Sequence, residues 1–222
     1  MPVPARQPWR AASTVLFALL LGAVAGPLSW YAHDHMTGAA RLAGDSAAAW
    51  LAIAFVAGRR SRSLIGGAVA GFLALGLTVA TYYLAQASYG TWVESQRAVG
   101  YWQLVAALTG PVFGAAGAAS RSAHPAVRGL AAAAMSAACC AEALIGYGGA
   151  FPGTMQTLYL YEGVIGLVVL VVLCREWRGL LAGAAWLPAL AFAGGRLVSA
   201  FLHAQHDPGL PVTGYLSGWL GT

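Results

Sequence analysis

The chain has 222 residues, of which 59% are hydrophobic and only 9% are charged. A water-soluble domain carries about 25% charged residues, so this composition and a mean hydropathy of +0.68 exclude a soluble protein and predict a polytopic membrane protein. The twelve basic residues are all Arg, and they are spread over short segments between apolar runs, which argues against nucleic acid as a partner despite the net charge of +5.

We predict an all-α fold, a bundle of about seven transmembrane helices in a single domain that covers residues 1–222. The predicted spans cover residues 11–32, 42–58, 64–86, 100–119, 126–147, 157–174 and 179–202. An alternative for the first span is a cleaved signal peptide, because a basic start, an apolar core and Ala23-Val24-Ala25 fit that template.

The second span has the shortest apolar run, from Ser46 to Gly58, which as a helix would reach only about 20 Å. That length alone favours a re-entrant segment. The arginines that follow at positions 59, 60 and 62 favour a crossing that begins at Leu42, with Asp45 in its first turn as a helix N-cap.

The third and fourth spans carry small residues at the spacing of closely packed helices. Gly67 and Gly71 lie four residues apart in the third span, and Gly110-Pro111 with Gly114 predicts a kinked, closely packed stretch in the fourth. Aromatic residues near the predicted outer helix ends, among them Trp30, Tyr82, Tyr83 and Trp102, are expected to form an interfacial belt.

The distribution of arginine predicts the orientation. With seven spans and a cytoplasmic N-terminus, nine arginines fall inside, at positions 6, 10, 59, 60, 62, 121, 128, 175 and 178. The outside segments hold only Arg41 and Arg97. The sequence therefore predicts that the N-terminus is inside and the C-terminus outside.

Three ionisable residues lie inside predicted spans, where a charge costs about 2.5–3.5 kcal/mol at the bilayer centre. They are Glu142, Glu162 and Arg196, each roughly 8–10 Å below the outer surface by helical rise. Since the last three spans are consecutive, Arg196 could bridge the two carboxylates in an outward-opening polar pocket. The predicted ligand-binding residues are Glu142, Glu162, Arg196, Asp45, Tyr159 and His203. Structural ion pairing within the bundle, or side chains that extend to the interface, are the alternatives.

Histidines on the predicted outer side are weak candidates for a metal site. They are His33, His35, His203 and His206, and solvated loop histidines are the alternative. The three cysteines, at positions 139, 140 and 174, lie in apolar runs without a metal-binding spacing and are expected to be buried packing residues. No hydrolase or nucleotide-binding motif is present, so the sequence predicts no reaction and leaves the cofactor unknown.

Several segments resemble a family of small bacterial integral-membrane proteins classed as a domain of unknown function. They are Gly44-Asp-Ser-Ala-Ala-Ala-Trp50, Phe55-Val-Ala-Gly58, Thr81-Tyr82-Tyr83, Trp102 to Gly114, and Ala141-Glu142-Ala143-Leu144. The resemblance covers most of the chain and implies a multi-pass bundle in the bacterial inner membrane. It implies no substrate, and Glu142 is the matching residue with obvious chemistry.

Two functional hypotheses follow. The first is binding or transport of a small solute or ion through an outward-facing polar site in the outer half of the bundle. The second is a non-catalytic interaction or assembly protein whose glycine-rich faces pack on helices of a partner membrane subunit or of another copy of the chain. In both, the lipid bilayer is the surrounding medium.

Overall fold

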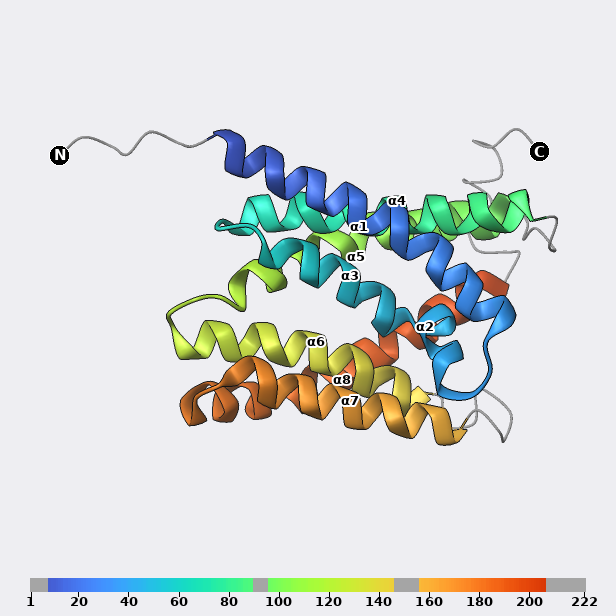
Figure 1. Cartoon of the computed structure of the whole chain (residues 1–222). Coiled ribbons are helices and arrows are strands. Elements are labelled where there is room, and N and C mark those ends of the chain that lie inside the picture. The colour runs from blue at the N-terminus through green and yellow to red at the C-terminus, as the bar shows by residue number, and fades with distance from the viewer. Residues whose placement is uncertain (1–7, 90–95, 146–155, 207–222) are drawn as a thin grey trace.

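The computed structural model describes residues 8–89, 96–145 and 156–206, and within these ranges the chain is helical and has no strand (Figure 1). The helices are α1 (Pro8–His35), the 3₁₀ helix η1 (Gly38–Arg41), α2 (Leu42–Asp45), α3 (Ala47–Arg59), α4 (Leu64–Ser88), α5 (Gln96–Ala119), α6 (Pro125–Ile145), α7 (Gln156–Cys174) and α8 (Trp177–His206). The prediction of an all-α fold is confirmed.

The predicted span at 42–58 is not one helix. Its first four residues form α2, and Ser46 then adopts an extended conformation (φ −82°, ψ 123°) before α3 begins. The Ser46 side chain accepts a hydrogen bond from the Ala49 N–H at 3.1 Å, so the N-cap of α3 is Ser46 and not Asp45. A serine hydroxyl that binds the first-turn amides favours a helix start at that point over continuation of the preceding turn.

Within the described residues, four helices are long and apolar enough to cross a membrane, judged by length and composition. They cover Ala11–His35, Leu64–Ser88, Ala98–Ala119 and Pro125–Leu144, and Ala47–Arg59 and Tyr159–Cys174 form shorter apolar helices. On α7 the exposed side chains are mostly large and aliphatic, at positions 160, 164, 165, 167, 168, 171 and 172. Such a surface is stable in lipid and not in water, so the fold fits a helical membrane bundle.

The helices form two groups (Figure 1). In the first group, α1 packs on α4, α4 on α5, and α3 on both α4 and α5. In the second group, α6 packs on α7 and α8. The groups meet mainly where α3 and α5 contact α6, so both helices form the boundary with the second group.

Glycines allow α3, α4 and α5 to approach at backbone distance. A Cβ at Gly114 of α5 would overlap the Gly67 carbonyl oxygen and lie 2.8 Å from the Gly71 Cα, both on α4. A Cβ at Gly58 of α3 would likewise overlap the backbone of Gly114. The predicted close packing of Gly67, Gly71, Gly110 and Gly114 is confirmed, and in a membrane such contacts stabilise helix association through van der Waals packing.

Three of the aromatic residues expected in an interfacial belt are buried instead, whereas Tyr31, also expected there, is exposed. Trp30, Tyr82 and Tyr83 are only 5%, 8% and 8% exposed and belong to one core cluster with Trp50 and Trp102 packed against it. The Trp50 and Tyr82 rings have centroids 5.2 Å apart. Aromatic residues near a helix end can either face the lipid headgroups or pack on each other inside the bundle. The position of a residue in the sequence does not show which of these it does.

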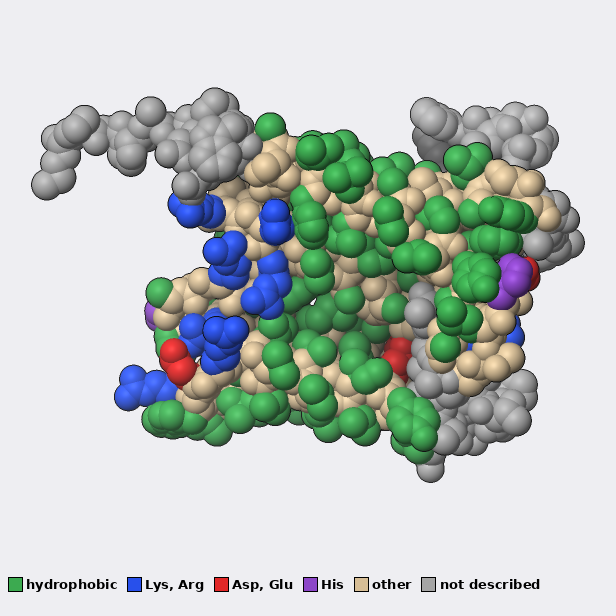
Figure 2. Space-filling model, in the orientation of Figure 1, with side chains coloured by type: hydrophobic (Ala, Val, Ile, Leu, Met, Phe, Trp, Pro, Cys, Tyr) green, Lys and Arg blue, Asp and Glu red, His purple; other side chains and the backbone are tan. Residues whose placement is uncertain are grey.

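Arginines gather at one end of the bundle (Figure 2). We call this the basic end, and its described arginines are Arg59, Arg60, Arg62, Arg121, Arg128, Arg175 and Arg178, which follow α3, α5 and α7 or begin α6 and α8. Arg121 Nη1 donates to the Arg59 carbonyl oxygen at 2.8 Å, which ties the end of α5 to the end of α3. The loops predicted to share one side of the membrane therefore do lie at one end of the fold.

Candidate functional site

Helix α3 is too short to cross a membrane on its own. It has 13 residues, which correspond to about 20 Å of a hydrocarbon core of about 30 Å. Since α3 ends at the basic end, a helix of this length would leave the α2–α3 break short of the opposite membrane surface. Within a bilayer, interrupted helices are tolerated only where protein groups satisfy their free amides.

Glu142 of α6 satisfies these amides. Its Oε1 accepts a hydrogen bond from the Ala47 N–H at 3.0 Å, and its Oε2 accepts from the Ala48 N–H at 2.8 Å and from the Ser46 hydroxyl at 3.1 Å. The carboxylate thus sits on the positive end of the α3 dipole. An acidic side chain from one helix group caps a helix of the other.

Glu162 of α7 lies beside this cap. It is only 4% exposed, it interacts electrostatically with Glu142, and it lies next to the Ser46 side chain. Its Oε2 is buried and has no hydrogen-bond partner in the described part of the chain. A buried carboxylate oxygen without a partner is costly, so this atom is the unusual feature of the site.

Tyr159 lies one helical turn before Glu162 and shares its surroundings. Its side chain is 6% exposed and interacts electrostatically with both glutamates and with Asp45. Helices α6 and α7 approach closely here, because a Cβ at Gly163 would lie 3.4 Å from the Ala143 Cβ. The structure therefore brings together three predicted residues, Glu142, Glu162 and Tyr159.

Asp45 is held by other partners at the edge of this cluster. It accepts a hydrogen bond from Arg41 Nε at 2.8 Å and pairs with His33 of α1. His33, a candidate metal ligand, is thus engaged with a carboxylate, while His35 lies 3.6 Å from Asp34 and stacks on Tyr31. Among the side chains that the structure describes, no three His, Cys, Asp or Glu residues form a group that could hold a metal ion.

Arg196 is not brought to the glutamates. Its side chain on α8 is exposed and forms no ion pair within the described residues, so the expected bridge between the two carboxylates is not formed. The side chains of His203 and His206 lie outside the described part of the structure. The α3 amides take the place that the sequence suggested for Arg196, because they supply the positive partner of Glu142.

Sequence reasoning missed these amides and the Ser46 hydroxyl. Main-chain donors have no residue signature, and only a helix start at the right place makes them available. The available signal was the short apolar run that begins at Ser46, which indicated a break inside the span.

The fold is consistent with a helical membrane bundle, and within it an interrupted helix is capped by an acidic side chain of a neighbouring helix. The chain belongs to the family of unknown function DUF6518, whose sequence model matches residues 5–202. The family resemblance expected from the sequence is confirmed. Neither the curated proteins nor the solved structures gave a match.

Proposed function

We propose that this protein binds a cation at the Glu142–Glu162 pair and carries it, alone or with a small solute, across the membrane. The observation that carries the proposal is the Glu162 Oε2 atom, which is buried, has no hydrogen-bond partner among the described residues and belongs to a carboxylate beside a second one. The α3 amides offset the charge of Glu142. The Glu162 Oε2 atom has no such partner among the described residues, and a proton or a small metal cation would supply the missing positive charge.

The interrupted α2–α3 segment supports transport over a purely structural pair. Membrane transporters place ion and substrate sites at interrupted helices near the middle of the bilayer, where free amides and side chains can replace a hydration shell. Ser46, in the interruption, contacts Glu142 and lies next to Glu162. The proposal includes seven spans, with the basic end in the cytoplasm. It places the protein in the inner membrane of a bacterial cell.

The test uses the full-length protein in proteoliposomes, with proton influx followed by an internal pH-sensitive dye and sodium uptake followed by a radioactive tracer. Glu162→Gln should abolish flux of the transported ion. The same variant should unfold at an equal or higher temperature than wild type in buffer without alkali cations, since a buried amide is less costly than an unpaired carboxylate. Glu176→Gln is the matched control, because this carboxylate is 58% exposed and lies at the basic end.

Wild-type flux in Glu162→Gln would overturn the proposal and favour the assembly protein. If this variant fails to fold, Glu162→Asp decides, because it keeps the charge and shortens the side chain by one methylene. A folded Glu162→Asp variant with altered ion selectivity or reduced flux supports the cation site, and one with unchanged flux contradicts it.

A further inference from the structure

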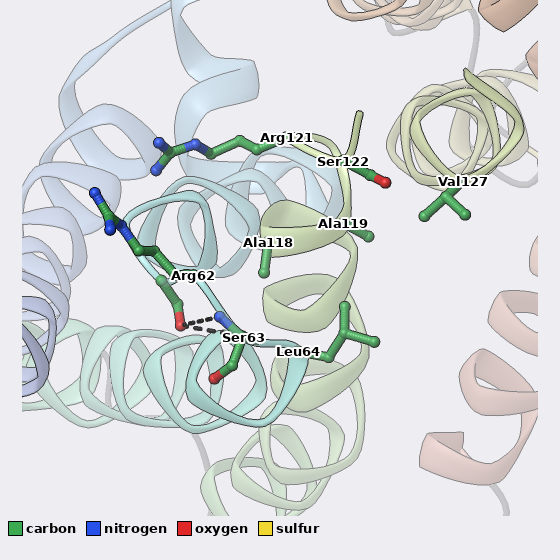
Figure 3. A pocket seen from close by; sticks show the side chains of 9 residues that line it. Arg62, Ser63, Leu64, Ala118, Ala119, Arg121, Ser122 and Val127 are labelled. Carbon is green, nitrogen blue, oxygen red and sulfur yellow. Dashed lines mark hydrogen bonds between the residues drawn. The ribbon is translucent and has the colours of Figure 1, made fainter. Parts of the chain in front are cut away.

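A cavity of about 370 Å³ lies at the basic end, remote from the two glutamates. It is formed where the loop between α3 and α4 meets the loop between α5 and α6 (Figure 3). Its lining includes two arginines, three serines and several apolar side chains. In Figure 3 the ends of Arg62 and Arg121 lie on one side, and Leu64 and Val127 lie on the other, and this separation carries the inference.

The arginines of the cavity lack acidic partners. Arg62 and Arg121 both line it and extend toward the same side in Figure 3, and neither forms an ion pair with a carboxylate in the described residues. Arg121 is oriented by its hydrogen bond to the Arg59 carbonyl oxygen at 2.8 Å. Glu176 lies near this end but pairs with Arg128 at 3.0 Å. Two guanidinium groups at one cavity, neither with an acidic partner among the described residues, favour an anion, for which arginine is well suited.

Serine hydroxyls add hydrogen-bond donors. Ser63 Oγ accepts from the Gly66 N–H at 3.0 Å and Ser122 Oγ accepts from the His124 N–H at 3.1 Å. Each of these described bonds uses the oxygen as an acceptor, so the hydroxyl hydrogen of each serine can still be donated to an anion. Ser63 also caps α4, whose positive end therefore faces the same loop.

The apolar part of the cavity indicates the source of the anion. Leu64 is 58% exposed and Val127 is 42% exposed, and both line the cavity. They lie at the first turns of α4 and α6, where two apolar helices leave the basic end. A free inorganic anion would make no use of these side chains, whereas a phospholipid has a phosphate for the arginines and an acyl chain for the leucine and valine.

We propose that this cavity binds an anionic phospholipid, with the phosphate at Arg62 and Arg121 and an acyl chain against Leu64 and Val127. The lipid would fill the space between the first helix group and the start of α6, so it would stabilise the contact between the two helix groups. The proposal is independent of the cation site, because no residue is shared between them.

The experiment measures lipid binding to the purified full-length protein by native mass spectrometry and by the shift in its unfolding temperature. The probes are phosphatidylglycerol, phosphatidylcholine, glycerol phosphate and inorganic phosphate. Phosphatidylglycerol should bind and stabilise the wild-type protein more than the other three. In the double variant Arg62→Gln/Arg121→Gln its apparent affinity should fall about tenfold or more, since charge-assisted contacts to the phosphate are lost.

The control is Arg175→Gln/Arg178→Gln, which removes the same charge from the basic end without changing the cavity lining. Equal loss of lipid binding in both double variants would overturn the proposal in favour of diffuse attraction. Equal stabilisation by inorganic phosphate and phosphatidylglycerol would overturn it in favour of a free-phosphate site. Equal binding of phosphatidylcholine and phosphatidylglycerol would overturn it too, because the charge of the lipid would then have no effect.

If the cavity double variant fails to fold, the single variant Arg62→Gln decides, because Arg62 makes no described hydrogen bond. An unchanged lipid preference in this variant would also contradict the proposal. Glu162→Gln should keep the lipid response whatever its effect on ion flux.

Discussion

The contact between Glu142 and the first turn of α3 links a single side chain to both the stability of the fold and the candidate site. One carboxylate accepts hydrogen bonds from two amides and a hydroxyl. All three donors lie at the start of α3, where Ser46 and Ala48 are buried and Glu142 is half-buried. The same residue therefore stabilises the fold and sets the charge that Glu162 meets.

Glu142→Ala should lower the free energy of unfolding by about 1–3 kcal/mol, because it leaves buried amides without an acceptor. Ser46→Ala should cost about 1 kcal/mol, the usual cost of losing an N-cap side chain. Equilibrium unfolding in mixed micelles measures both. The control is Leu144→Ala on the same helix, where the side chain is 63% exposed, and a Glu142→Ala protein as stable as this control would contradict the role of the cap.

The sequence could identify both glutamates but not their partners. An acid in an apolar run stands out by its insertion cost, and this signal located Glu142 and Glu162. Counting residues along a helix gives depth, however, and not the direction of the side chain around the helix axis. Counting could therefore not show that Arg196 on the folded helix is exposed and forms no ion pair within the described residues.

At the scale of the element, glycine determines how closely α3, α4 and α5 pack. Gly114→Val should lower the free energy of unfolding by about 2–4 kcal/mol, because the new side chain meets backbone atoms of Gly67 and Gly71 that cannot move aside. Gly76→Ala is the control on α4, since nothing lies within 4 Å of a Cβ there. This control should be neutral or more stable by up to about 1 kcal/mol.

Gly114→Val could be accommodated only if the helices moved apart, and a wild-type unfolding free energy would contradict the packing described here.

The sequence predicted this packing well, because glycines at four-residue spacing have few other uses in an apolar helix. It did not predict the break at Ser46, because apolar composition and charge distribution describe a crossing without showing where its helix is interrupted.

At the scale of the whole molecule, the predicted orientation can be tested by chemical labelling. In a variant whose native cysteines are replaced, Arg41→Cys should react with a membrane-impermeant maleimide in intact cells, because it lies at the end opposite the basic end. Arg178→Cys should react only after the cells are permeabilised. The reverse pattern would mean that the basic end faces outward.

The position of the cap between the two helix groups has a mechanical consequence. Glu142 belongs to the group formed by α6, α7 and α8, whereas the amides of Ala47 and Ala48 belong to the group that contains α3. If one group rocks against the other, these hydrogen bonds must break, and the α3 amides and the Glu142 carboxylate are released together. If Glu162 binds a cation as proposed, the charge beside the cap changes, and the strength of these hydrogen bonds between the two helix groups changes with it.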